Sequence, residues 1–164
     1  MRFSFSYNKG KVLQALRYHF IAQSEIRVLF IVIILFDIIS AVFYFSGRIR
    51  PEPFLLGSVI WFVFILSFWF FMPYAVYKKS TTFREAFTIS FQPSYVSLEN
   101  PNGRVEWEWN RFMKYFESPN FFHLYFSAKA FFLVPKDGLT SDTQHELRVL
   151  LSSRIQLPVK KYYR

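Results

Sequence analysis

The 164-residue sequence contains no cysteine, which excludes a disulfide framework and any thiolate chemistry. It also lacks the glycine-rich phosphate-binding loops G-x-x-x-x-G-K-[ST] and G-x-G-x-x-G. The N-terminal stretch MRFSFSYNKGKVLQALRYHF has no short apolar core followed by small residues, so we expect no cleaved signal peptide. The chain therefore gives no indication of an oxidising compartment.

Catalytic and metal-binding patterns are missing as well. The three histidines, His19, His123 and His145, have no metal-ligand spacing such as H-E-x-x-H. Glu106 and Glu108 lie two residues apart, which on a strand places them on one polar, solvated face rather than as an acid and base pair. We therefore expect a non-enzymatic protein without a metal or cofactor.

Apolar and basic residues dominate the chain. It is 52% hydrophobic and 23% aromatic, and its formal net charge is +9. The positive residues form no single long run, so nucleic acid is not an expected partner. A chain that is both apolar and basic is typical of a protein at an anionic phospholipid bilayer.

Two stretches are long and apolar enough to cross a membrane as helices. VLFIVIILFDIISAVFYF covers residues 28–45 with one charge, and FLLGSVIWFVFILSFWFFMPYAV covers residues 54–76 with none. A helical span takes roughly 17–25 residues. The linker SGRIRPEP is short and contains Gly and Pro, so the two helices are predicted to pack as an antiparallel hairpin.

Lysine and arginine predict the orientation of this hairpin. They are more frequent on the side of the chain termini than in the linker, and the positive-inside rule then places both termini in the cytoplasm. The residues concerned are Lys9, Lys11, Arg17 and Arg27 before the first span, Lys78, Lys79 and Arg84 after the second, and Arg48, Arg50 and Glu52 between them.

Asp37 lies at the middle of the first span. A central Asp costs about 2.5–3.5 kcal/mol, whereas the surrounding Leu, Ile, Phe and Val residues together return on the order of 4–8 kcal/mol, so the helix is expected to insert with Asp37 turned away from lipid. One interpretation is a functional contact with a second copy or another membrane protein. The other is protonation, or a hydrogen bond within the hairpin to Ser58, Ser67 or Tyr44.

The stretch FFHLYFSAKAFFLV, residues 121–134, raises the question of a third span. It is too short for one and contains Lys129, so we predict a β-hairpin that turns at SAK, with one face buried and the other partly covered. VEWEW alternates, which places Val105, Trp107 and Trp109 on one face of a strand. The six strands of the predicted antiparallel meander are residues 87–91, 95–98, 105–109, 112–117, 121–126 and 130–134.

Elements at both ends of the chain complete the predicted fold. Ser141 and Gln144 predict a capping box for a helix over residues 141–154. Its apolar face consists of Leu147, Leu150, Leu151 and Ile155. Near the N-terminus, residues 3–7 are a candidate seventh strand, and residues 11–22 are predicted to form a helix.

The predicted architecture is a membrane α+β protein. A two-helix transmembrane hairpin is combined with a small antiparallel β-sandwich or partly open barrel, closed by the C-terminal helix. Residues 1–25 would form the N-terminal strand and amphipathic helix, residues 26–77 the hairpin, and residues 78–164 the cytoplasmic β domain.

The chain resembles the YcxB-like family of bacterial membrane proteins. The resemblance rests on ALRYHF (residues 15–20) before the hairpin, on VEWEWNRFMKYFESPNFFHLYFSAKAFFLVPK, and on ELRVLL in the last helix. It implies a pleckstrin-homology-like fold for the cytoplasmic domain and a place in the bacterial inner membrane, but no biochemical activity. The residues that match the family's pattern are Trp107 or Trp109, Glu117, Tyr125, Pro135 and Lys136.

Two functions from different classes remain open. In the first, the membrane-anchored domain binds a protein partner or anionic lipid without catalysis. In the second, the protein is a sensor or an accessory subunit of a transporter, in which Asp37 changes protonation or pairs with another helix. Either one is compatible with a homo-oligomer.

Basic residues near the expected membrane surface are candidate lipid contacts, although orientation and anchoring alone would also explain them. These candidates are Lys9, Lys11, Arg17, Lys78, Lys79, Lys160 and Lys161.

Overall fold

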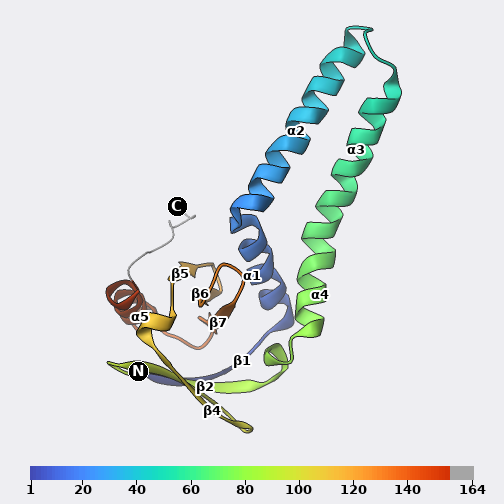
Figure 1. Cartoon of the computed structure of the whole chain (residues 1–164). Coiled ribbons are helices and arrows are strands. Elements are labelled where there is room, and N and C mark those ends of the chain that lie inside the picture. The colour runs from blue at the N-terminus through green and yellow to red at the C-terminus, as the bar shows by residue number, and fades with distance from the viewer. Residues whose placement is uncertain (156–164) are drawn as a thin grey trace. The chain divides into compact units, whose positions relative to one another are not determined.

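The computed structural model describes residues 1–155 and divides the chain into two compact units. The first, which we call the β unit, combines Met1–Lys11 with the chain from Thr81 onward, and the second, the helical unit, is Val12–Ser80. The chain thus leaves the β unit after its first strand and returns to it for the second. Figure 1 shows the elements along the chain.

The helical unit contains two helices that are long and apolar enough to cross a membrane, as predicted. The first has 22 residues, and the second runs without a break for 29 residues, Pro51–Lys79. They pack as a hairpin around the linker at residues 46–50 (Figure 1). The elements are α1 (Lys9–Ala22), α2 (Ser24–Phe45), α3 (Pro51–Leu66), the π-helical turn η1 (Ser67–Phe71) and α4 (Met72–Lys79).

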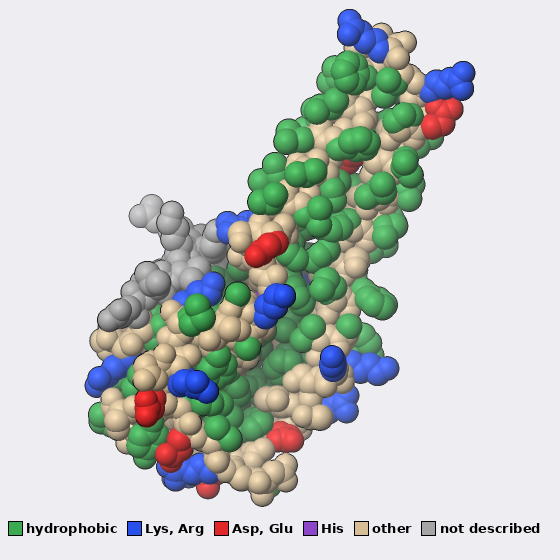
Figure 2. Space-filling model, in the orientation of Figure 1, with side chains coloured by type: hydrophobic (Ala, Val, Ile, Leu, Met, Phe, Trp, Pro, Cys, Tyr) green, Lys and Arg blue, Asp and Glu red, His purple; other side chains and the backbone are tan. Residues whose placement is uncertain are grey.

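Ring contacts hold α2 against α3, and Gly57 of α3 lies at the contact between them. The ring of Phe30 meets Trp61 and Phe64 at centroid distances of 5.4 and 5.1 Å, and Tyr44 stacks on Phe54 at 5.9 Å. Small residues let apolar helices approach closely where packing, rather than burial from water, drives association. The outward side chains are mostly apolar, and they cover the visible face of the hairpin in Figure 2.

Among residues 1–155, seven strands form two antiparallel sheets in the β unit. One sheet has the order β1-β2-β3-β4 and the other β5-β6-β7. All six strands predicted from the sequence are present, and the N-terminal candidate is confirmed as β1, which pairs with β2. The strands are β1 (Arg2–Ser6), β2 (Ala86–Phe91), β3 (Tyr95–Asn100), β4 (Gly103–Glu108), β5 (Lys114–Glu117), β6 (Phe121–Tyr125) and β7 (Phe131–Pro135).

The meander is interrupted between β4 and β5, which corrects one prediction. A short helical turn, η3 (Trp109–Arg111), ends β4 before Trp109, so this residue does not share a strand face with Val105 and Trp107. Trp109 is buried and its Nε1 donates to the carbonyl of Gln92 at 3.0 Å, whereas Val105 is exposed. A buried indole N–H needs a hydrogen-bond acceptor. Because Trp109 lies in the turn η3, its indole reaches the carbonyl of Gln92.

Alternation along the strands builds the core between the sheets. Every second residue points inward, as in Phe87, Ile89 and Phe91 of β2, because successive side chains of a strand face opposite sides. Leu147, Leu151 and Ile155 from the last helix close the core, as predicted. The remaining buried members are Phe5, Val96, Leu98, Trp109, Phe112, Tyr115, Phe122, Leu124, Phe132 and Val134.

The aromatic stretch of β6 and β7 is a hairpin, as predicted. The backbone N–H of Phe126 donates to Ala130 at 2.9 Å, which leaves the predicted SAK segment as the turn. Both faces of β6 are buried, however, whereas we expected one face to be only partly covered. On the second face, His123 lies among the rings of Phe116, Tyr125 and Phe131, so the density of aromatic residues reflects burial on two sides.

The last helix, α5, spans Ser141–Arg154, as predicted. Its N-cap residue lies one position earlier than predicted. The N-cap is Thr140, whose Oγ1 accepts from the backbone N–H of Thr143 at 3.2 Å. Gln144 donates its side-chain amide to the carbonyl of Leu139 instead of forming the predicted capping box with Ser141. The hydroxyl of a Thr can accept from the free N–H groups at the start of a helix as that of a Ser does.

Replacing Leu151 by Ala should destabilise the β unit by about 2–5 kcal/mol, because it removes a fully buried side chain and leaves a cavity. Val149 lies on the same helix but is 54% exposed, so Val149→Ala is the matched control and should change stability by roughly 0.5 kcal/mol or less. Thermal unfolding of the full chain in detergent micelles, followed by tryptophan fluorescence, measures both. Equal melting temperatures for the two variants would contradict the assigned core.

Candidate functional site

Asp37 lies where α2 crosses α3. A Cβ built on Gly57 would overlap Oδ1 of Asp37 and come within 2.9 Å of the Phe36 ring, so the absence of a side chain at Gly57 makes room for the carboxyl group. Oδ1 is buried and has no hydrogen-bond partner among residues 1–155. A carboxyl oxygen without a hydrogen bond in an apolar setting is costly.

The hydrogen-bond donors expected for Asp37 are used elsewhere or lie apart from it. Ser58 donates its hydroxyl to the carbonyl of Phe54 at 2.9 Å, one turn back on its own helix. Tyr44 stacks on Phe54 near the linker. Ser67 lies in the π-helical turn and lines a separate groove. The structure therefore groups Asp37 with Gly57 rather than with the two serines.

A second polar feature of the helical unit arises from Pro73. Proline has no N–H, so the carbonyl of Trp69, four residues earlier, loses its helical donor. The π-helical turn η1 ends at this point, where the N–H of Met72 bonds to the carbonyl of Ser67, five residues back. Nε of Arg17 on α1 donates to the carbonyl of Trp69 at 2.9 Å and satisfies it.

Arg17 also stacks on the aromatic residues of this turn. Its guanidinium carbon lies 5.1 Å from the centre of the Trp69 ring and 5.8 Å from that of Phe70. These cation–π contacts add to the hydrogen bond and hold the plane of the guanidinium group in one orientation. Arg17 is the predicted lipid contact with the most defined surroundings.

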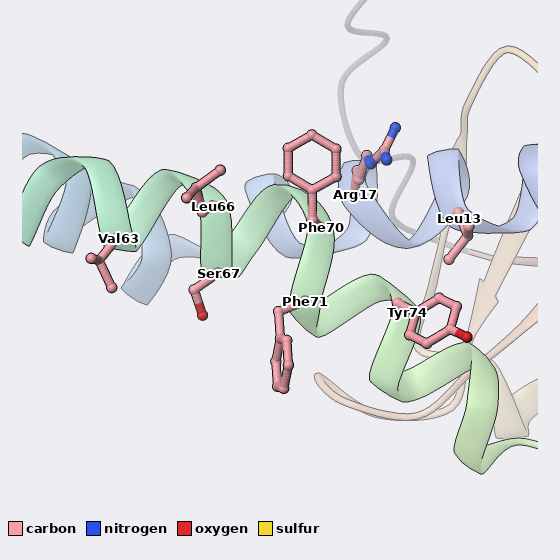
Figure 3. A pocket seen from close by; sticks show the side chains of 8 residues that line it. All are labelled: Leu13, Arg17, Val63, Leu66, Ser67, Phe70, Phe71 and Tyr74. Atoms are coloured by element: carbon pink, nitrogen blue, oxygen red, sulfur yellow. The ribbon is translucent and has the colours of Figure 1, made fainter.

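An apolar groove of about 670 Å³ lies beside Arg17. Figure 3 shows Leu13 and Arg17 projecting from α1, and the other side chains of its wall projecting from the second apolar helix. Arg17 is the one charged residue of this wall. The others are Leu13, Val63, Leu66, Ser67, Phe70, Phe71 and Tyr74.

The other predicted lipid contacts that the structure describes are divided between the two units, with Lys9 and Lys11 in the β unit and Lys78 and Lys79 in the helical unit. Lys11 donates to Asp137 at 2.7 Å within the β unit, so its charge is already partnered. Lys78 and Lys79 are exposed in the last turn of α4, and Lys9 is exposed in the first turn of α1. Lys160 and Lys161 lie outside the described residues.

The strongest polar cluster of the β unit surrounds Glu117 at the end of β5. Arg148 of α5 binds its carboxylate through two parallel hydrogen bonds of 2.8 and 2.7 Å. Lys136, just after β7, donates to Glu117 and to the carbonyl of Ser118, both at 2.7 Å. Nζ of Lys136 lies 4.9 Å from the centre of the Phe122 ring. One carboxylate thereby joins both outer strands of the three-stranded sheet to the helix.

These contacts change the protonation of Glu117. Burial favours the neutral carboxyl and raises its pKa, but hydrogen bonds from Arg148 and Lys136 outweigh burial and lower the pKa from 4.5 to about 2. The same pairing raises the pKa of Arg148. Glu117 is therefore ionised at every physiological pH and acts as a fixed structural anion.

The histidines are dispersed in the structure. His123 is buried in β6, with Nε2 2.9 Å from the hydroxyl of Ser118, and His19 on α1 lies 2.8 Å from the amide nitrogen of Gln23. Ser118 is itself buried, so the Ser118–His123 pair lies inside the β unit rather than on its surface. Within residues 1–155, no group of three or more metal-ligating side chains gathers.

Three features of these sites were missed by sequence reasoning. From the sequence, Gly57 is predicted only to lie within the second span, although a glycine at mid-span indicates close helix contact. The pairing of Arg148 with Glu117 joins residues 31 positions apart and leaves no local pattern. The role of Pro73 in freeing the Trp69 carbonyl follows from the i−4 rule, but the donor that satisfies it, Arg17, is 52 residues away.

Comparison with known proteins confirms the family predicted from the sequence. The family model described as YcxB-like protein matches residues 91–151. This segment runs from the last residue of β2 into α5 and contains the whole Glu117, Lys136 and Arg148 cluster, whereas the helical hairpin lies outside it. No curated protein and no solved structure matches the chain.

Replacing Glu117 by Gln should lower the free energy of unfolding of the β unit at pH 7 by on the order of 3 kcal/mol. Because the folded-state pKa of about 2 is below the ordinary 4.5, the stabilisation is complete above pH 4.5 and is lost as the pH falls toward 2. The melting temperature of the wild type should therefore fall in this window, and that of the variant should fall less.

Glu99→Gln is the matched control, since Glu99 pairs with Arg2 at an exposed site and contributes roughly 0–1 kcal/mol. Circular dichroism of the full chain at pH 7, 4.5 and 3 makes the comparison. The same pH dependence in wild type and Glu117→Gln would show that the cluster does not stabilise the fold.

Proposed function

We propose that this member of the YcxB-like family is a non-enzymatic integral protein of the bacterial inner membrane, in which a helical hairpin anchors a cytoplasmic β unit that binds a protein partner. The exposed apolar surface of the hairpin carries the membrane part of the proposal. Ile31, Leu56 and Phe62 are 56, 60 and 62% exposed, which water disfavours and a bilayer accommodates.

The pairing of β1 with β2 supports a hairpin that crosses the membrane twice. β1 precedes the helical unit and β2 follows it, yet both belong to one sheet. A membrane-crossing segment between them must therefore cross an even number of times. Two apolar helices meet this condition and leave both ends of the hairpin on the side of the β unit.

The architecture of the β unit supports a pleckstrin-homology-like assignment. A four-stranded and a three-stranded antiparallel sheet enclose one core that is closed by a C-terminal helix. Because a fold by itself does not define a function, we base the proposal of partner binding on an exposed strand edge of this unit.

The outer edge of β4 is the surface that we propose for the partner. β4 is the last strand of its sheet, so among the described strands its outer edge is unpaired. An extended segment of another protein can add to such an edge through backbone hydrogen bonds. Beside it lies a polar groove of about 590 Å³, lined by Tyr95, Glu106, Glu108, Trp109, Asn110 and Arg154 among others.

A second candidate function rests on the buried Oδ1 of Asp37. A carboxyl group without a partner inside a span can take up a proton or pair with a helix of another protein. In that case the chain would serve as a sensor or as an accessory subunit of a transporter.

The orientation can be tested with single cysteines, because the natural chain has none. In intact cells, a membrane-impermeant maleimide should label Arg50→Cys in the linker but should reach Glu146→Cys on α5 only after lysis, since both positions are exposed on their own units. The reverse pattern would reject the orientation, and labelling of both only after lysis would reject a transmembrane hairpin.

Photo-crosslinking tests the partner surface. Replacing Val105 of β4 by benzoylphenylalanine in the full chain should give a specific crosslinked protein in native membranes, whereas the same change at Val149 of α5 should not. The two positions are matched, at 51 and 54% exposure.

The same crosslink in an Asp37→Leu background separates the two candidate functions. A retained product supports binding by the β unit, and its loss supports a role for Asp37 in pairing. Equal products at Val105 and Val149 would reject the β4 edge as the binding surface.

A further inference from the structure

The groove beside Arg17 lies at a defined depth along the second apolar helix. Phe70 follows Pro51 by 19 residues, and at about 1.5 Å per residue this corresponds to roughly 28 Å. The hydrocarbon core of a bilayer is about 30 Å thick. With the linker at residues 46–50 at one boundary of this core, Trp69 and Phe70 lie at the level of the opposite boundary, next to the headgroup region that contains the phosphates.

Arg17 has hydrogen-bonding capacity to spare at this level. Its Nε is used by the carbonyl of Trp69, and its plane is held over the Trp69 and Phe70 rings. Within residues 1–155, neither terminal nitrogen of the guanidinium group has a hydrogen-bond partner, and no carboxylate forms an ion pair with it. A planar guanidinium with free terminal N–H groups matches the oxygens of a phosphate.

The lining of the groove beside Arg17 suits an acyl chain. Apart from Arg17, its side chains are apolar or aromatic with the single hydroxyls of Ser67 and Tyr74, and none is acidic. The volume of about 670 Å³ is within the range of pockets that bind small ligands. A positive group at the end of an apolar groove is complementary to a molecule with a negative head and an apolar tail.

We infer that this groove binds one anionic phospholipid, with its phosphate on the terminal nitrogens of Arg17 and part of an acyl chain along Leu13, Leu66 and Phe70. The inference rests on the proposed membrane insertion and adds to it a lipid site in the helical unit. Pro73 is the structural origin of this site. It leaves the Trp69 carbonyl without a helical donor, and that carbonyl holds Arg17 in place.

The test uses the purified full chain in dodecylmaltoside micelles, mixed with phosphatidylglycerol and phosphatidylcholine of the same acyl chains. Native mass spectrometry counts the bound lipids of each class. Arg17→Gln removes the charge but keeps an N–H for the Trp69 carbonyl. Arg48→Gln, in the linker, makes the same charge change away from the groove.

The wild type should prefer phosphatidylglycerol, and Arg17→Gln should reduce that preference about five-fold, as expected for one base near an anionic headgroup. Arg48→Gln should leave it unchanged. Leu66→Trp fills the groove while Arg17 remains, and it should reduce binding of both lipids. Because the preference is a ratio within one sample, partial loss of folded protein does not alter it.

An unchanged preference in Arg17→Gln, or an equal loss in Arg48→Gln, would overturn the inference. Unchanged binding in Leu66→Trp would likewise overturn it, since the groove would then hold a helix of a second copy or a partner, or nothing. Extraction with alkaline carbonate keeps these outcomes separate from the proposed function. A chain that stays in the membrane pellet without lipid preference loses only this site, whereas a chain that is extracted loses the membrane anchor itself.

Discussion

Five residue pairs join β1 to β2, from Arg2 opposite Ser90 to Ser6 opposite Ala86, and the arrangement of the whole chain depends on this ladder. It closes a segment of almost eighty residues whose two ends return to one sheet. The N-terminal residues continue the connection, since the backbone N–H of Phe91 donates to the carbonyl of Met1 at 2.8 Å. Any membrane topology of the helical unit must respect this closure.

Within the helical unit, two residues that interrupt the run of bulky apolar side chains, Gly57 and Pro73, have structural consequences. Gly57 makes room for Asp37 where the helices cross, and Pro73 frees a carbonyl that Arg17 satisfies. An unsatisfied backbone carbonyl in an apolar setting is costly, so the contact of Arg17 with Trp69 is both structural and a way to place a charge beside an apolar groove. Both features therefore depend on a residue that is not a bulky apolar one, a glycine in the first case and a proline in the second.

The β unit uses a charged cluster to fix the element that closes its core. Leu147, Leu151 and Ile155 bring α5 to the sheets through apolar burial, which has no direction. Arg148 and Glu117 add direction through two parallel hydrogen bonds. The segment that matches the model of the YcxB-like family contains this cluster in full.

The sequence by itself determined the elements of this protein: two apolar helices, seven strands and the closing helix. Each depends on a local pattern, such as alternation in residues 87–91 or the length of an apolar run, and local patterns are visible in one dimension. It also indicated the family, through residues of the β unit.

Only the tertiary structure decided which residues meet. The strand break before Trp109, the burial of both faces of β6, and the contacts of Gly57 with Asp37, Arg17 with Trp69 and Arg148 with Glu117 depend on groups distant in the chain. For Trp109, the Trp69 carbonyl and Glu117, the cost of leaving the polar group unpaired selects the partner, and this cost can be assessed only when the neighbours in space are known.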